Sequence, residues 1–224
     1  MKNKIILYFI VVLMIFFSVG CGKSNSNAKV VKKYSKEEIS KIEKDYLGSE
    51  NILKIASAND ISDKGKVIVG VVDKGVFSLN DIVEYIDIYG NLKKVSVVGV
   101  ELFQKQDKTA VKDDEPALLL QGNKVFISNS SILFKRKDYN GISVYLNIDQ
   151  DQINKVKDYL DKSDHINVEV DDKKYNAELV SFSVNDEGKN ISVSLILDDN
   201  ISVVEKKIKF LDINLDGYIV NKLK

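Results

Sequence analysis

Apolar and polar residues alternate along most of the chain beyond residue 65, and a period of two is typical of β-strands that bury one face. In the first half of this region we expect strands at 66–72, 81–88, 92–103, 118–120 and 125–127. In the second half we expect strands at 143–148, 166–170, 175–184, 191–197, 207–213 and 218–220. Asp216-Gly217 predicts a tight hairpin turn between the last two strands.

Two segments have helical spacing instead. Ser35 and Glu38 form a capping box that predicts a short helix at about 36–47. The segment 149–163 is the longest helical stretch, because four large side chains fall on one face of it: Ile153, Val156, Tyr159 and Leu160. Each domain that follows the first helix is therefore expected to be β-rich, and the second also contains a helix.

The first twenty residues have the pattern of a targeting segment. Lys2 and Lys4 precede an uncharged apolar run at 5–17, which is too short to span a hydrocarbon core of about 30 Å as a helix. The run ends before Cys21, and Ser18-Val19-Gly20-Cys21 resembles the cleavage site of bacterial lipoproteins. An uncleaved anchor helix with an incidental Cys is the alternative.

Cleavage before Cys21 would leave a lipidated cysteine at the start of the mature chain. Acyl chains, including palmitate, would attach that cysteine to the cell membrane, since each buried methylene contributes about 0.8 kcal/mol. Residues 22–29 are small and polar and are typical of a flexible tether. We therefore expect a lipid-anchored protein on the extracytoplasmic face of the cell membrane.

Composition excludes several classes of site. The chain has 224 residues, and its 33 Lys+Arg balance its 33 Asp+Glu, so it lacks the basic excess of most nucleic-acid binders. The chain has one Cys and one His, which are too few for a disulfide framework or a Cys/His zinc site and argue against Cys-His or Ser-His-Asp catalysis that relies on Cys21 or on several His. We expect no nucleic acid, no metal and no cofactor.

The segment 65–84 resembles the opening hairpin of domain 2 of elongation factor Tu, a small β-barrel shared by the translational GTPases. The segment 97–103 is similar to the next long strand of that domain, and 117–122 to its Leu-rich strand. Gly75 and Asn80 stand at turn positions that need a left-handed backbone, which Gly and Asn tolerate. The matching residues of the first segment are Gly65, Val67, Gly70, Val72, Gly75, Asp81, Val83 and Glu84.

The resemblance implies a fold and one candidate site residue. Glu101 matches an acidic residue that lies near the terminal ribose of tRNA in the translation factors; an ordinary exposed strand residue is the alternative. Gln121 replaces the usual Arg of the family, and 112–116 departs from its turn. The chain has no GxxxxGK[ST] phosphate loop, so we expect no nucleotide binding and no GTPase activity.

The second half of the chain is similar to the β-barrel domain of HlyD-like membrane-fusion (periplasmic adaptor) proteins. Segments 144–160 and 166–200 carry the resemblance, with Tyr175 opening a motif that lacks the family's Gly. The lipoyl segment and the coiled-coil hairpin of that family are absent. The resemblance implies an α+β barrel domain and leaves its role in transport open.

Together these patterns predict a mainly β protein in four parts. A lipoprotein signal peptide at 1–20 precedes the lipidated Cys, tether and short helix at 21–47. A small barrel of the elongation factor Tu domain 2 type occupies 48–137, and a second β-rich domain of α+β type with one helix occupies 138–224. We expect the segment from Gly65 to Gly122 to close into a barrel of about six strands.

The search for reactive groups gives no catalytic set. Asp212, Asn214 and Asp216 fit the first half of a calcium loop, but the Glu that such a loop needs at position 12 is Leu223, and an Asp-Gly turn explains the same residues. His165 has no second ligand near it in the sequence and is interpreted as the first residue of a strand. The carboxylate pairs fall in predicted turns, and they are Asp113/Asp114 and Asp198/Asp199. The aromatic residues of the strands could line a groove or pack across strands, and they are Tyr85, Tyr89, Phe103, Tyr139 and Tyr145.

The expected function is therefore non-catalytic. A membrane-anchored binding or assembly module would offer barrel surface or strand edges to a protein partner in the cell envelope. One alternative is an adaptor of a transport or secretion system, and another is an envelope hydrolase of unknown substrate.

Overall fold

The computed structural model describes residues 32–61, 65–103, 105–122, 125–127, 130–184, 190–199 and 206–224. Within it, Lys33–Lys224 form one compact unit. The expected signal peptide at 1–20, the lipidation site Cys21 and the tether at 22–29 lie outside the described residues.

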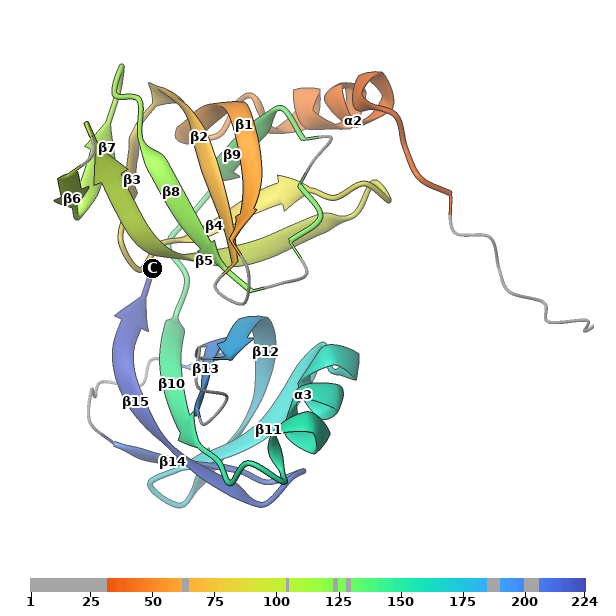
Figure 1. Cartoon of the computed structure of the whole chain (residues 1–224), viewed down its shortest axis with the longest axis vertical. Helices are drawn as coiled ribbons and strands as arrows, with labels where there is room; N and C mark the ends of the chain where they lie inside the picture. Colours follow the sequence, from red (N-terminus) through yellow and green to blue (C-terminus); the bar gives the residue numbers. More distant parts are fainter. Residues whose placement is uncertain are drawn as a thin grey trace, which may run out of the picture. The chain divides into compact units, whose positions relative to one another are not determined.

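Six strands close the first barrel (Figure 1) in the order β4–β9–β1–β2–β8–β5, with β5 pairing back onto β4. Every pair in this ring is antiparallel. The strands are β1 (Asn51–Ile61), β2 (Gly65–Lys74), β4 (Ile82–Ile86), β5 (Leu92–Leu102), β8 (Ala117–Gln121) and β9 (Ile132–Lys135). Outside the ring, β6 (Lys105–Asp107) extends β5, and β3 (Val76–Ser78) pairs with β7 (Thr109–Val111).

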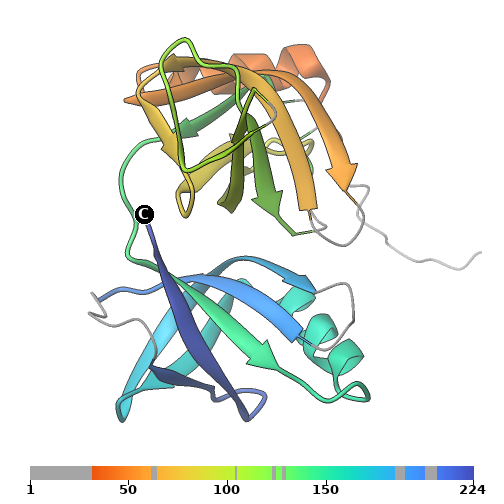
Figure 2. The ribbon, with the colours of Figure 1, turned by 60° about the vertical axis from the view of Figure 1, so that its left-hand side comes forward.

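Six more strands close the second barrel (Figure 2) in the order β10–β13–β12–β11–β14–β15, and β15 pairs with β10. They are β10 (Gly141–Asn147), β11 (His165–Val170), β12 (Lys173–Val184), β13 (Asn190–Ile196), β14 (Lys207–Phe210) and β15 (Leu215–Leu223). All pairs are again antiparallel.

Each barrel encloses its own apolar core, because alternate residues of every strand point inward. Phe77, Leu118 and Val97 belong to the first core, and all three are fully buried. Phe210 and Val193 are equally buried in the second. The expected fold class, mainly β with two β-rich domains and a short preceding helix, is confirmed.

Both expected helices are present. The first, α2 (Lys36–Glu43), continues as a single 3-10 turn, η1 (Lys44–Tyr46), and starts at the predicted capping box of Ser35 and Glu38. The buried carboxylate of Glu43 accepts hydrogen bonds from the Ser130 hydroxyl at 2.6 Å and from the Ser131 backbone N–H at 2.9 Å, which holds α2 against the first barrel.

The second helix, α3 (Ile153–Lys162), begins four residues later than the predicted segment, which started at residue 149. Residues 149–152 form a turn, in which the Gln152 N–H donates to the Asp149 carbonyl. Ile153, Val156 and Leu160 project from α3 into the second core.

The first barrel uses more of the chain than the predicted 65–122. Its β1 and β9 lie on either side of that segment, and β1 pairs with both β2 and β9. The sequence signal for these strands is weak, since β9 is buried on both faces and the outer half of β1 is polar and exposed. Neither strand therefore shows the alternation on which the prediction relied.

Two local predictions are wrong. The described segment 125–127 is not a strand; Val125 and Ile127 are buried, but this segment follows the barrel wall without joining its hydrogen-bond ladder. Asp216-Gly217 is not the hairpin turn, which lies at residues 211–214 instead. Gly217 lies within β15, where a Cβ atom would come within 2.6 Å of Leu146, so the glycine allows β15 to approach β10 closely.

The two left-handed turn positions are confirmed. Gly75 has a φ of +69° and Asn80 a φ of +72°. The turn at Asn80 is closed by the Asp81 carboxylate, which accepts a hydrogen bond from the Ser78 N–H at 2.7 Å.

Candidate functional site

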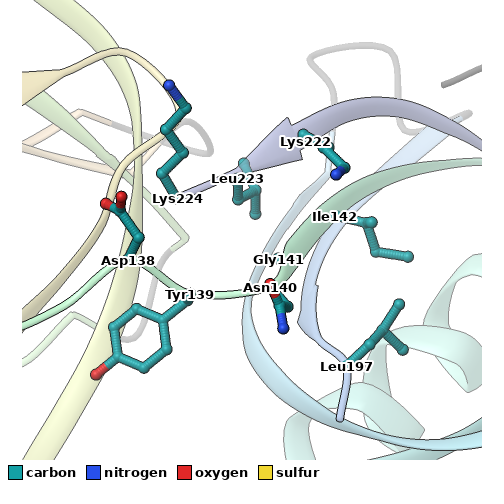
Figure 3. A pocket seen from close by; sticks show the side chains of 9 residues that line it. All are labelled: Asp138, Tyr139, Asn140, Gly141, Ile142, Leu197, Lys222, Leu223 and Lys224. Carbon is teal, nitrogen blue, oxygen red and sulfur yellow. The ribbon is translucent and has the colours of Figure 1, made fainter. Parts of the chain in front are cut away.

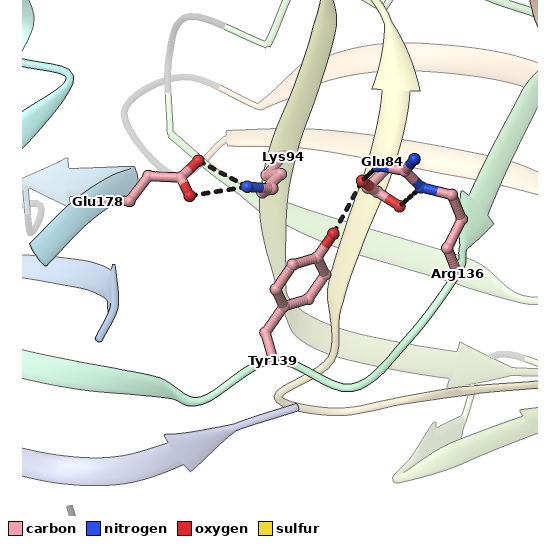
Figure 4. A network of polar contacts seen from close by, with 5 residues as sticks. All are labelled: Glu84, Lys94, Arg136, Tyr139 and Glu178. Carbon is pink, nitrogen blue, oxygen red and sulfur yellow. Dashed lines mark hydrogen bonds and ion pairs between the residues drawn. The ribbon is translucent and has the colours of Figure 1, made fainter. Parts of the chain in front are cut away.

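A buried carboxylate lies where the chain leaves the first barrel. The Glu84 side chain on β4 is fully buried, and both of its oxygens are bound by residues that follow β9 (Figure 4). Arg136 donates from Nε to Oε2 at 2.8 Å and from Nη2 to Oε1 at 2.5 Å. The Tyr139 hydroxyl donates to Oε1 at 2.8 Å. These three side chains, called the Glu84 network below, fix the segment that links the barrels.

The hydrogen bonds decide the charge state of this network. Burial by itself would raise the pKa of Glu84, but the hydrogen bonds from Arg136 and Tyr139 outweigh it and lower the pKa below its ordinary value of 4.5. The hydrogen bond to Glu84 raises the pKa of Arg136. Burial is the main cause that raises the pKa of Tyr139, and its hydrogen bond to the Glu84 carboxylate raises it further. The network therefore holds a carboxylate–guanidinium pair at neutral pH.

A second ion pair connects the two barrels directly. Lys94 on β5 donates to both carboxylate oxygens of Glu178 on β12, at 2.8 and 2.7 Å, and both side chains are mostly buried. The Lys94 ammonium also lies 5.2 Å from the centre of the Tyr139 ring, within the range of a cation–π contact. Lys94 therefore joins the Glu84 network to the second barrel.

A cluster of hydroxyl groups around Gln121 forms the centre of the junction. The Gln121 Oε1 accepts from the hydroxyls of Ser96 at 2.8 Å, Ser181 at 2.9 Å and Ser194 at 2.6 Å. Its amide Nε2 donates to the Ser183 hydroxyl at 3.3 Å and to the Ser192 carbonyl at 3.2 Å. Gln121 and Ser96 come from the first barrel and the other groups from the second, so this Gln121 cluster aligns the barrels through uncharged hydrogen bonds.

Beside this junction lies a groove of about 990 Å³, lined by both barrels. One wall comes from the β4–β5 hairpin and residues 125–126, and includes Tyr85, Tyr89 and Phe126. The other comes from α3 and β12 and includes Phe182 and the single histidine, His165. The volume lies at the upper end of the roughly 300–1,000 Å³ typical of ligand pockets, and the lining is mixed, with aromatic and aliphatic side chains beside charged ones such as Lys93, Asp161 and Asp164.

The charged groups of the groove are partly matched. Lys94 and Glu178 pair across it. Asp87 is buried and caps a turn by accepting from the N–H groups of Tyr89 and Asn91, both at 2.9 Å. Lys157 on α3 has no ion-pair partner within the described ranges and remains available to a ligand.

A smaller cavity of about 200 Å³ lies between the linking segment and the end of β15 (Figure 3). Here the main chain of Lys224 bonds to the first barrel, donating to the Asn80 carbonyl at 2.9 Å and accepting from the Ile82 N–H at 2.5 Å. The volume is below the typical pocket range, so the larger groove is the candidate binding site. The residues around the cavity are Asp138–Ile142, Leu197 and Lys222–Lys224.

The structure separates Glu101 from this groove. Glu101 is exposed near the end of β5, opposite Gln106 of β6. Cys21 lies outside the described residues. His165 begins β11, as the sequence predicted, and lines the groove with Asp164.

Of the possible calcium residues, Asp212 is used structurally. Asp212 accepts from the Asn167 N–H at 3.0 Å and from the Tyr159 hydroxyl at 2.7 Å, which lowers its pKa. Burial and the same contact raise the pKa of Tyr159 to about 12. Asp216 lies opposite Lys209 in the β14–β15 pair. Across the described ranges, no three His, Cys, Asp or Glu side chains gather as a metal site.

The remaining candidate side chains divide between structure and surface. Asp114 accepts from the Val111 N–H at 2.7 Å within a turn, and Asp199 pairs with Lys173 at 2.6 Å. Asp113 and Asp198 are exposed. Of the aromatic candidates, Tyr85 and Tyr89 line the groove, Tyr139 joins the Glu84 network, and Phe103 and Tyr145 are exposed elsewhere.

Sequence reasoning missed the junction as a site, although two signals were present. Ser181, Ser183, Ser192 and Ser194 alternate with apolar residues in two predicted strands, which marks a polar, uncharged strand face. Arg136 is the only Arg in a Lys-rich chain, and Arg is preferred over Lys where a carboxylate is bound through two hydrogen bonds.

No protein-family model matches this chain. Among the described residues, no helix has the length and apolar character needed to cross a membrane.

Proposed function

We propose that this protein is a lipid-anchored, extracytoplasmic binding module that holds an amphipathic ligand in the groove between its barrels. The groove itself is the observation that carries the proposal, because its volume of about 990 Å³ fits a ligand and aromatic side chains from both barrels line it. The Glu84 network and the Gln121 cluster support a preformed site, since they hold the two walls in place.

The role is proposed as non-catalytic because three of the ionisable groups of the groove are already engaged in an ion pair or a turn. Lys94 and Glu178 neutralise each other, and Asp87 is used by its own turn. The aromatic surfaces of Tyr89, Phe126 and Phe182 would contact apolar parts of the ligand, while Lys157 would bind an acidic group.

A tryptophan reporter tests the groove. The chain has no Trp, so Phe126→Trp places a single fluorophore at a half-exposed position in the groove. With a mixed-sequence octapeptide library as the amphipathic probe, we expect a saturable change in the fluorescence of this variant. Phe103→Trp, at an exposed turn outside the groove, is the matched control and should not respond. Equal responses from the two reporters would argue against a groove ligand.

Attachment to the membrane is tested separately at Cys21. Cells fed a clickable fatty acid should label the wild-type protein and leave Cys21→Ala unlabelled, because the variant has no thiol to acylate. In membrane fractionation we expect the wild-type protein in the pellet. Retention of the label in Cys21→Ala would contradict lipidation at this residue.

A further inference from the structure

The start of the described chain lies against one wall of the groove. The Tyr34 N–H donates to the Ile88 carbonyl at 2.7 Å. The Tyr34 ring packs on Gly90, where a Cβ atom would come within 3.2 Å of it. Ile88 and Gly90 belong to the turn between β4 and β5, and Tyr89 between them lines the groove. The segment that leads to the expected anchor therefore meets the folded protein at the groove.

The length of that segment keeps the groove near the membrane. Residues 21–34 span at most about 45 Å even when fully extended, at ~3.3–3.6 Å per residue. With Cys21 lipidated, as the proposed function assumes, the β4–β5 turn stays within that reach of the bilayer. A single acyl chain binds a bilayer only marginally and reversibly, so single-chain lipids leave it and are available at the groove.

Apolar side chains remain partly exposed on both walls of the groove. Phe126 is 44% exposed, and the half-buried Tyr89 ring lies edge-on to it, with 6.1 Å between the ring centres. On the opposite wall, Leu179 and Phe182 pack only partly against the second core. An acyl chain between the walls would remove apolar surface of both from water.

The groove is also lined by charges of both signs. Lys157 on α3 is half-buried, Lys93 and Asp164 are exposed, and none of the three has an ion-pair partner within the described ranges. Asp161 lies one turn beyond Lys157 on α3 and adds a second carboxylate. A ligand with one cationic and one anionic group matches this lining, because each of its charges then meets an opposite one.

We propose that the groove binds a zwitterionic single-chain lipid, with a phosphate and an ammonium in its head group. This ligand class rests on the proposed function, since it specifies the occupant of the same groove and requires the anchor at Cys21. Lys157 donates to the phosphate, and Asp164 accepts from the ammonium. The acyl chain lies between Phe126 on one wall and Phe182 on the other.

Bromine, which quenches tryptophan on contact, tests the proposal. The full-length Phe126→Trp protein is reconstituted in phosphatidylglycerol vesicles that contain lysophosphatidylethanolamine with a brominated acyl chain. We expect saturable quenching of this reporter as the content of the brominated lipid rises. Phe103→Trp, at an exposed turn outside the groove, is the control for general membrane contact and should be quenched much less.

Substitutions in the reporter protein test the head-group contacts. Lys157→Met should raise the lipid content needed for half-maximal quenching about tenfold, because one charge-assisted hydrogen bond is lost. Lys155→Met, at an exposed position of α3 outside the groove, is the control and should change little. Asp164→Asn should weaken quenching by lysophosphatidylethanolamine but not by brominated lysophosphatidylglycerol, which has no ammonium. None of these side chains is fully buried, so circular dichroism should be unchanged.

Equal quenching of the two reporters would overturn the proposal, as would affinities that neither Lys157→Met nor Asp164→Asn changes. If the octapeptide library alters the fluorescence of Phe126→Trp while the brominated lipid does not, the groove binds peptides and only the lipid ligand fails. A reporter that responds to neither probe would overturn the proposed function as well.

Discussion

Replacing Arg136 by Met should lower the free energy of unfolding by about 3 kcal/mol at pH 7. The substitution keeps an apolar stem of similar length but leaves the Glu84 carboxylate buried without its guanidinium partner. Removing one partner of a buried ion pair typically costs about 3–5 kcal/mol. The lower end applies because the Arg136 side chain is itself 44% exposed and the Tyr139 hydrogen bond to Glu84 remains.

The loss should depend on pH in a defined direction. In the wild type the pKa of Glu84 is below its ordinary value, so the stability that the network contributes is present at neutral pH and is lost as the pH falls through the folded-state pKa. Without Arg136, burial becomes dominant and raises the pKa of Glu84. The deficit of Arg136→Met relative to the wild type should therefore be largest at pH 7 and shrink toward pH 4.5.

Urea unfolding at the two pH values, followed by circular dichroism, measures both effects. The matched control is Lys173→Met, which breaks the pair of Lys173 with Asp199, whose side chains are 58% and 62% exposed. An exposed pair contributes little, so this variant should lose much less stability than Arg136→Met. Equal losses in the two variants would mean that the Glu84 network does not stabilise the fold as described.

Replacing Gln121 by Ala should lower the free energy of unfolding by about 2–3 kcal/mol. The change removes the acceptor shared by Ser96, Ser181 and Ser194, which are part of a largely buried surface between the barrels. A buried donor that loses its partner costs about 1–3 kcal/mol. The total is smaller than three such losses, because Ser96 also lies 3.0 and 2.9 Å from the other two hydroxyls and can bond to them.

Gln121→Ala should also uncouple the barrels. Calorimetric unfolding should broaden or separate into two transitions, since each barrel has its own core and the cluster is shared. Gln106→Ala, at an exposed position on β6, serves as the control and should change little. A single sharp transition in Gln121→Ala, at the wild-type temperature, would show that the cluster does not couple the barrels.

Strands with one buried face were predictable because their alternation is local. The segments that became β2, β10 and β11 show it, and the capping box at Ser35 and Glu38 is an equally local signal. β9 was not predictable, because all four of its residues are buried and no alternation remains. Gly217 was misinterpreted as a turn residue, because a glycine required by close strand approach looks the same in sequence as one required by a turn.

The sequence by itself determined the mainly β class, the two domains that follow a helix, and the left-handed turns at Gly75 and Asn80, because backbone preference and side-chain period act over a few residues. The tertiary structure alone decided that Gln121 meets serines more than 50 residues away and that Glu84 meets Arg136, 52 residues later. It also brought the walls of the groove together. The physical reason is that barrel closure and barrel pairing are set by the total burial of two cores, and no short window of residues carries that information.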